Sequence, residues 1–235
     1  MPDLAPTIDA QISKDNQSSW ANARDATSGT ASTSGTRSTQ AIYAKHGAAR
    51  GGGSVYSVHR AFFEFDTSGI SATPSDSTLK IRGFIANSAD FFVVKANFSD
   101  GALAAADFDA IVGWSAGSDN DGNVTKYSSE ITTWDRNGYN DITLNAAALT
   151  SMRDDDLVKF CLIESTLDLP NNTPSSVTKA TGMYFQDYTG TSLDPILNYT
   201  AGAAGYGNAV IGVAAANIGS INGVATANIE KVIGV

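Results

Sequence analysis

Apolar and polar residues alternate with a period of two along the middle of the chain. In Val55–Asp66, Phe63 and Phe65 fall on one face, whereas Arg60 falls on the other. The segment 79–83 alternates in the same way. This period is typical of β-strands that bury at least one face, so both segments are predicted to be strands.

Two further runs, Phe91–Val94 and Leu157–Ile163, are apolar on both faces, as expected of central strands in two stacked sheets. Shorter strands are expected at Ile142–Leu144, Met183–Tyr188 and Pro195–Tyr199. Turn sequences rich in Asp, Asn, Ser and Gly separate the strands, and no βαβ rhythm is present. Single helical turns are expected within 102–112 and 146–153. The pattern predicts an all-β protein with a sandwich or jelly-roll fold.

The first 54 residues are polar by comparison. Thr27–Thr39 is dominated by Ser and Thr, and Gly51–Gly53 follows it. Such a stretch has little apolar surface to bury, so we expect a long mobile loop over about residues 21–54. The apolar pieces Leu4–Ile12 and Ala41–Ala44 are candidates for edge strands.

The order of these segments is similar to that of a known family. The motif R-x-x-F-x-F-D-x-S-x-I (60–70) is followed by a Leu/Ile strand (79–81), a late Phe strand (183–185) and the motif P-x-L-x-Y (195–199). This order resembles the DNRLRE-type jelly-roll modules, which are β-sandwiches similar to carbohydrate-binding modules. Similar domains also occur in bacteriophage structural proteins. The resemblance implies a jelly-roll β-sandwich over about residues 1–200 and carries over no sugar-binding residue.

Residues 201–235 differ in composition from the rest of the chain and contain a sequence repeat. We call this segment the repeat tail. The pattern x-G-V-A-x-A-N-I-x-x-I/V occurs at 211–221 and again at 222–232. These repeats resemble the short C-terminal arrays of phage virion proteins. The tail is too short and too rich in Gly to form its own core, so its aliphatic residues are expected to be buried against a partner copy or another subunit. The alternative is a strand and turn packed on the chain's own sandwich. The predicted assembly interface comprises Val213, Ile218, Ile221, Val224, Ile229, Val232 and Val235.

Composition and charge limit the kinds of function that the protein can have. Only 17% of the 235 residues are charged, which favours a turn-rich β protein over a helical one. The net charge of −9 repels phosphate backbones, so we expect no nucleic-acid partner. The first residues have neither the basic nor the apolar region of a signal peptide, and the longest apolar run, Ala209–Ala216, is too short to span a bilayer. We therefore expect synthesis in a host cytoplasm, a location in the virion and no membrane contact.

Few side chains point to catalysis. Cys161 is the only cysteine and lies in an apolar run, where a free cysteine acts as a small hydrophobe. His46 and His59 have no His or Cys at metal-ligand spacing, so structural or solvated roles are expected. Asp66 begins a D-T-S-G turn and is expected to accept backbone N–H groups. Arg60 is expected to pair with a carboxylate on a neighbouring strand. We expect a protein that is not an enzyme.

An acidic loop partly matches a calcium-binding template. Asp119, Asp121 and Asn123 fall at positions 1, 3 and 5, and Glu130 falls at position 12. Position 6, where the template needs glycine, is Val124. A Ca²⁺ site at these four side chains is one reading, and an acidic surface turn without a cofactor is the other.

Aromatic residues gather between 113 and 140. Trp114, Trp134 and Tyr139 are candidates for a glycan-binding face, because an aromatic ring stacks on the apolar face of a sugar; Tyr127 lies among them. The alternative is that these rings anchor loops over the edge of the sandwich.

These observations favour a non-enzymatic virion structural protein of a bacteriophage, as a capsid decoration, head-fibre or tail-fibre component anchored through its apolar repeats. Its expected partners are other virion proteins and itself, as a homo-oligomer for which a trimer is one form. The main alternative is a carbohydrate-binding module or adhesin that binds a cell-surface glycan. A polysaccharide-cleaving enzyme on the same scaffold is a third reading.

Overall fold

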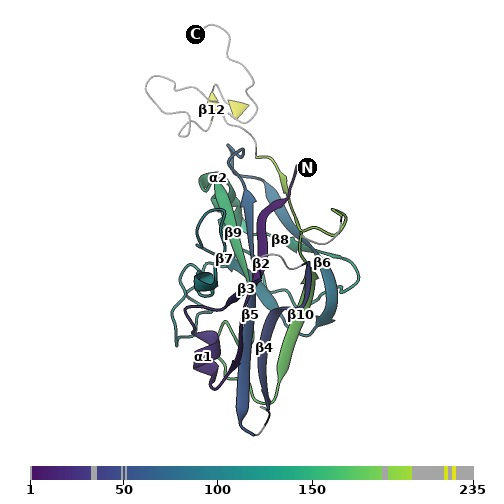
Figure 1. The fold of residues 1–235 in the computed structure, drawn as a ribbon. Coiled ribbons are helices and arrows are strands. Elements are labelled where there is room, and N and C mark those ends of the chain that lie inside the picture. The colour runs from purple at the N-terminus through teal and green to yellow at the C-terminus, as the bar shows by residue number, and fades with distance from the viewer. Residues whose placement is uncertain are drawn as a thin grey trace.

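The computed structural model describes residues 2–32, 36–48, 50, 52–186, 190–202, 220–221 and 224–225. This part of the chain is mostly β, with two short helices, α1 (Trp20–Arg24) and α2 (Ala146–Asp154), and one 3₁₀ turn, η1 (Ala105–Asp107). The helices lie toward opposite ends of an elongated body (Figure 1). None of the helices in the described ranges is long and apolar enough to cross a membrane.

Eleven strands in the described residues form one large antiparallel sheet. They are β1 (Asp3–Leu4), β2 (Pro6–Gln17), β3 (Thr30–Ser32), β4 (Arg37–Ala48), β5 (Ser54–Asp66), β6 (Asp76–Asn87), β7 (Phe91–Lys95), β8 (Tyr139–Thr143), β9 (Leu157–Glu164), β10 (Thr178–Tyr184) and β11 (Ile196–Thr200). The main path runs β1-β11-β6-β10-β4-β5-β2-β3, while β9 pairs with β5 and β7, and β8 pairs with β6. A separate two-stranded pair joins β12 (Ser220–Ile221) and β13 (Val224–Ala225).

Two long strands change partners along their length. On one edge, the first half of β5 pairs with β4 and the second half with β9, while β2 follows the other edge. Likewise, β6 pairs first with β11 and then with β10. These changes bring the β5–β9–β7 strands and the β11–β6–β8 strands to a common interior.

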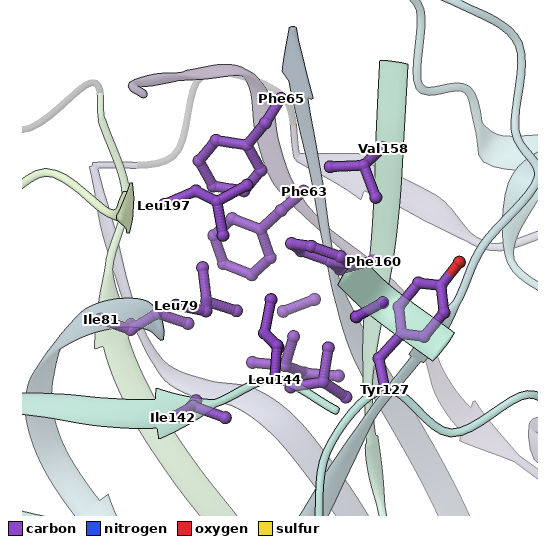
Figure 2. Close-up of a cluster of buried hydrophobic side chains, with 14 of the residues drawn as sticks. Phe63, Phe65, Leu79, Ile81, Tyr127, Ile142, Leu144, Val158, Phe160 and Leu197 are labelled. Atoms are coloured by element: carbon purple, nitrogen blue, oxygen red, sulfur yellow. The ribbon is translucent and has the colours of Figure 1, made fainter. Parts of the chain in front are cut away.

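The main core fills that interior. It contains Phe63 and Phe65 of β5, Phe160 of β9, and Leu79 and Ile81 of β6, all with no exposed surface. Figure 2 shows these side chains pointing toward one another from the different strands. The alternation read from the sequence therefore identifies the inward face of β5 correctly, because each inward side chain is separated from the next by one that points outward.

A second core covers the outward face of β5. Phe62 of β5 and Cys161 of β9 are buried there, and Trp20 of α1 and Phe108 pack over them. Residues 96–124 contribute much of this cover. As a result, β5 is buried on both faces, although only one of its faces reads as uniformly apolar.

A fully buried ion pair lies in the second core. Nε and Nη2 of Arg60 donate to the two carboxylate oxygens of Asp168 at 2.9 and 2.7 Å. Nη1 also donates to the carbonyl of Phe108 at 2.8 Å, and Nη2 to that of Arg24 at 3.1 Å. The guanidinium carbon is 4.1 Å from the ring centroid of Trp114. The expected carboxylate partner is thus present, but it lies in the loop after β9 and not on a strand.

Arg24 is a second buried arginine at this place. Its Nε donates to the carbonyl of Asp168 at 2.5 Å, and its Nη2 donates to the carbonyl of Ser118 at 2.9 Å. Its Nη1 pairs with Asp25 at 2.5 Å. The two arginines together fasten α1, β5 and the loops around residues 108–118 and 168 to one another.

The prediction of a long mobile loop over about residues 21–54 is wrong. This region contains most of α1, the strand β3 and the twelve-residue strand β4. Nor is β4 an edge strand, because it lies between β5 and β10 and buries Ala41–Ala44. Thr is favoured in strands, so a Thr-containing polar sequence does not by itself exclude sheet structure.

Most other predicted elements are confirmed. The strands expected at 55–66, 91–94 and 157–163 are β5, β7 and β9; β5 and β9 are central, whereas β7 pairs with β9 alone among the strands of the described residues. The helical turn expected within 102–112 is η1, whereas α2 has nine residues and is longer than the single turn expected there. The segment Leu4–Ile12 belongs to β1 and β2, and β2 pairs with β5 along most of its length. Oδ1 of Asp66 accepts hydrogen bonds from the backbone N–H and the hydroxyl of Ser68, at 3.0 and 2.6 Å, which keep the pKa of Asp66 below its usual value. The finer jelly-roll arrangement stays a prediction.

Breaking the buried pair should be costly. We expect Arg60→Met to lower the free energy of unfolding by about 3–5 kcal/mol, because Asp168 is left charged and buried. The double variant Arg60→Met/Asp168→Leu should recover a large part of that loss, since no unpaired carboxylate remains. Urea unfolding followed by tryptophan fluorescence measures both. Lys80→Met, which breaks an exposed pair with Asp141, is the control and should change stability by less than about 1 kcal/mol. Equal effects of the two single variants would contradict this account.

Candidate functional site

A groove of about 740 Å³ lies between residues 128–135 and the strand β8 with the two residues that follow it. The two segments meet at both ends. At one end, Asn145 N–H donates to the carbonyl of Tyr127 at 2.8 Å. At the other end, Asp135 N–H donates to Oδ1 of Asn140 at 2.6 Å, and Nδ2 of Asn140 donates back to the carbonyl of Asp135 at 2.9 Å.

Between these ends the segments diverge. Ile131 exchanges backbone hydrogen bonds with Phe91 of β7, at 2.8 and 3.2 Å, so residues 128–135 follow β7. β8 instead pairs with β6. The groove is therefore the gap that opens where two extended segments, joined at both ends, each follow a different neighbour.

Two aromatic side chains line the groove. Trp134 is half-buried, with its Nε1 donating to the carbonyl of Gly182 at 3.1 Å and its ring edge against Phe91. Tyr139 is also half-buried, and its hydroxyl donates to the carbonyl of Asp194 at 2.9 Å. Burial and the nearby Asp194 raise the pKa of Tyr139. Because both polar atoms are used inside the protein, the rings contribute apolar surface to the groove.

The rest of the lining combines the apolar side chains Ile131, Ile142 and Leu144 with polar side chains, most of them exposed. The carboxylates are Glu130, Asp135 and Asp141, and hydroxyls come from Thr132, Thr133 and Thr143. Asp141 pairs with Lys80 at 3.2 Å, whereas Glu130 makes no ion pair within the described part of the chain. Aromatic rings beside carboxylates and hydroxyls suit a ligand that has both apolar faces and many hydroxyl groups.

The structure separates the predicted aromatic candidates. Trp134 and Tyr139 lie in the same groove. Trp114 lies elsewhere, against the guanidinium groups of Arg24 and Arg60, and its buried Nε1 has no hydrogen-bond partner in the described part of the chain. Tyr127 is fully buried, and its hydroxyl donates to Ser151. Trp114 and Tyr127 therefore fit the alternative in which the rings anchor loops. Trp134 and Tyr139 remain candidates for a glycan-binding face.

Sequence patterns did not reveal the polar half of the groove. Asn140 closes the groove at one end, and Thr132 and Asp141 face it, yet none of them belongs to a recognisable motif. Residues 128–135 form no regular strand, so no periodic signal marks them. Among the residues that line the groove, the sequence indicated only the aromatic ones as candidates for glycan binding.

The predicted calcium ligands do not converge among the described residues. Oδ1 of Asp119 accepts from the backbone N–H of Asp121 at 2.9 Å, and Oδ1 of Asp121 pairs with Lys126 at 2.7 Å. Glu130 lines the groove. Within the described ranges, no group of three His, Cys, Asp or Glu side chains is placed to hold a metal ion. Calcium binding stays a prediction, and Lys126 would compete for Asp121.

The reactive side chains are held in structural contacts. Cys161 has no exposed surface, and burial raises the pKa of its thiol. Nε2 of His59 is 2.8 Å from Asp15 and its ring packs on Tyr43; the His59 hydrogen bond lowers the pKa of Asp15. Nδ1 of His46 accepts from the backbone of Ser176 at 2.8 Å.

The predicted assembly residues lie mostly outside the described residues. Ile221 and Val224 are opposite each other in the antiparallel pair β12–β13. The remaining five, Val213, Ile218, Ile229, Val232 and Val235, fall in ranges that the structure does not describe.

The thiol of Cys161 should be inert in the folded protein. Because it is buried and its pKa is raised, we expect no reaction with an aromatic disulfide reagent at pH 8 and full reaction in urea. Absorbance of the released thiolate measures this. The variant Ser129→Cys places a thiol at an exposed position and should react at once. Fast labelling of the folded wild-type protein would contradict the buried placement.

Comparison with known proteins leaves the family open. No protein-family model matches the chain, and no curated protein matches it either. The site is therefore interpreted from its own residues.

Proposed function

We propose that the chain is a non-enzymatic structural protein of a bacteriophage particle, with a jelly-roll sandwich over about residues 1–200 that is anchored through its C-terminal repeats. The observation that carries the proposal is the eleven-residue aliphatic repeat that follows a body with its own complete cores. Capsid decoration, head fibre and tail fibre are the positions that fit such an arrangement. Its partners would be other virion proteins and further copies of itself.

The position of the residues that precede the repeats supports an anchoring role. β1 pairs with β11, and Tyr199 N–H donates to the carbonyl of Pro2 at 3.4 Å, so the N-terminus and the end of β11 lie together (Figure 1). At Gly202 a Cβ atom would be 1.9 Å from the carbonyl oxygen of Thr73. Only glycine permits this approach, so the last described residue before the repeats is fixed next to the loop 72–73.

The strand pairing supports the jelly-roll component of the proposal. In such folds, long antiparallel strands contribute to two facing layers around one core. β5 and β6 both change partners along their length, and their inward residues share the main core.

Removing the tail should separate folding from assembly. We expect the full chain to form oligomers and a chain ending at Gly202 to be monomeric, because the aliphatic repeats have no core of their own. Light scattering coupled to gel filtration measures the mass, and the melting temperatures of the two chains should agree within about 3 °C. The full-length double variant Ile229→Asp/Val232→Asp keeps the length and should also be monomeric. Oligomers of the shortened chain, or a monomeric full chain, would reject the proposal.

A second candidate function is glycan binding at the groove. The observation that favours it is the placement of Trp134 and Tyr139 in one groove together with exposed carboxylates and threonines. Sugar rings offer apolar faces to aromatic rings and hydroxyl groups to carboxylates, so a neutral glycan of a cell surface matches this lining. A virion protein and a glycan-binding protein are compatible, since one chain can be anchored at its tail and bind through its body.

Filling the groove should abolish glycan binding. We expect Thr132→Trp to weaken binding of neutral glycans at least tenfold, because the new ring occupies the groove while the core contacts of Trp134 remain. A glycan array followed by calorimetry on the best ligand measures it. Thr39→Trp adds the same ring at an exposed position of β4 and should bind like wild type. Unchanged binding in Thr132→Trp, or no glycan bound by wild type, would exclude this function.

A further inference from the structure

We infer that a second, smaller pocket binds a carboxylate group, and we assign to it the acidic sugar unit of a glycan. The pocket is about 330 Å³ and lies at β6 and the turn 135–138, next to the groove. Its lining residues are Arg82, Gly83, Phe84, Arg136, Asn137 and Tyr184. The choice of a sugar rests on the proposed glycan binding, whereas the carboxylate site stands on its own geometry.

The walls of the pocket are fixed by close backbone packing. Gly83 N–H donates to the carbonyl of Gly138 at 2.9 Å, and a Cβ atom at Gly83 would be 2.1 Å from the carbonyl oxygen of Asp135. The turn therefore lies directly on β6, which only a glycine allows. On the other side of β6, the register with β10 brings Tyr184 beside Phe84, with ring centroids 5.1 Å apart.

The positive charge in this pocket is not neutralised by the described residues. Arg82 and Arg136 take part in no ion pair within the described ranges, whereas Arg24, Arg60 and Arg153 each pair with an aspartate there. Beside the pocket, the guanidinium carbon of Arg37 lies 4.6 Å from the ring centroid of Phe84. This concentration of arginine is unexpected in a chain with a net charge of −9.

One atom of the pocket lacks a hydrogen-bond partner within the described residues. Nη1 of Arg82 is buried and makes no hydrogen bond to any of them. An unsatisfied buried donor is costly, and more so when the group is charged, so native proteins rarely keep one without a reason. A ligand oxygen in the pocket would satisfy it.

The lining selects the class of ligand. Guanidinium groups bind planar carboxylates through two parallel hydrogen bonds, and Arg82 and Arg136 supply two such groups. The rings of Phe84 and Tyr184 provide an apolar wall, and the amide of Asn137 provides a neutral polar contact. A volume of about 330 Å³ is near the lower limit for small-molecule sites, which fits one sugar unit rather than a long chain.

The test compares glucuronate with glucose, acetate and sulfate by calorimetry. We expect glucuronate to bind the full-length protein, with at least tenfold weaker binding in Arg82→Gln and in Arg136→Gln. Arg136 is exposed on its turn, so its substitution leaves the fold intact even if Arg82→Gln unfolds. Arg153→Gln removes an exposed arginine elsewhere and should bind like wild type. Glucose should not bind at this site.

Other outcomes overturn the inference in distinguishable ways. If glucuronate does not bind, or binds equally to Arg136→Gln and wild type, there is no carboxylate site. If acetate or sulfate binds as tightly as glucuronate and depends on the same arginines, the assignment to a sugar is wrong. Thr132→Trp should leave glucuronate binding unchanged, because Thr132 lines the groove and not this pocket. Loss of groove binding and loss of pocket binding are therefore measured separately.

Discussion

The buried pair of Arg60 and Asp168 is the constraint on which the outer half of the protein depends. Removing both charges from water is expensive, and the cost is offset only when the geometry is good and the remaining donors are satisfied. Here the guanidinium donates two hydrogen bonds to the carboxylate and two to backbone carbonyls, at 2.7–3.1 Å. The carbonyls belong to Arg24 and Phe108, so one side chain fixes α1, β5 and two loops in a single arrangement. Misplacing any of these segments would leave a buried charge without its partners.

β5 makes this arrangement possible because it is buried on both faces. Phe63 and Phe65 fill the main core, and Arg60 and Phe62 point into the second core. Loops that would otherwise be exposed become a second layer over the sheet. The result is a body whose apolar side chains are buried in two cores, one on each face of β5.

Both proposed binding places are built around residues 128–140, which include the start of β8. Residues 128–135 follow β7, β8 follows β6, and the turn between them lies against Gly83. The groove on one side carries carboxylates and the pocket on the other carries arginines. One turn therefore separates two surfaces of opposite charge, which would allow a ligand to be recognised by its neutral and its acidic parts at once.

The sequence by itself determined the β class, the central strands, the inward face of β5, the turn at Asp66 and the buried character of Cys161, because each depends on residues close together in the chain. It predicted a loop over about residues 21–54, although β4 begins at Arg37, near the end of the Ser/Thr-rich stretch, since β4 is held by neighbours on both sides that composition does not reveal. Tertiary structure alone decided the partner of Arg60, which is 108 residues away, and the gathering of Trp134 with Tyr139 and of Arg82 with Arg136. These contacts join distant or irregular segments, where no local period records which side chains will meet.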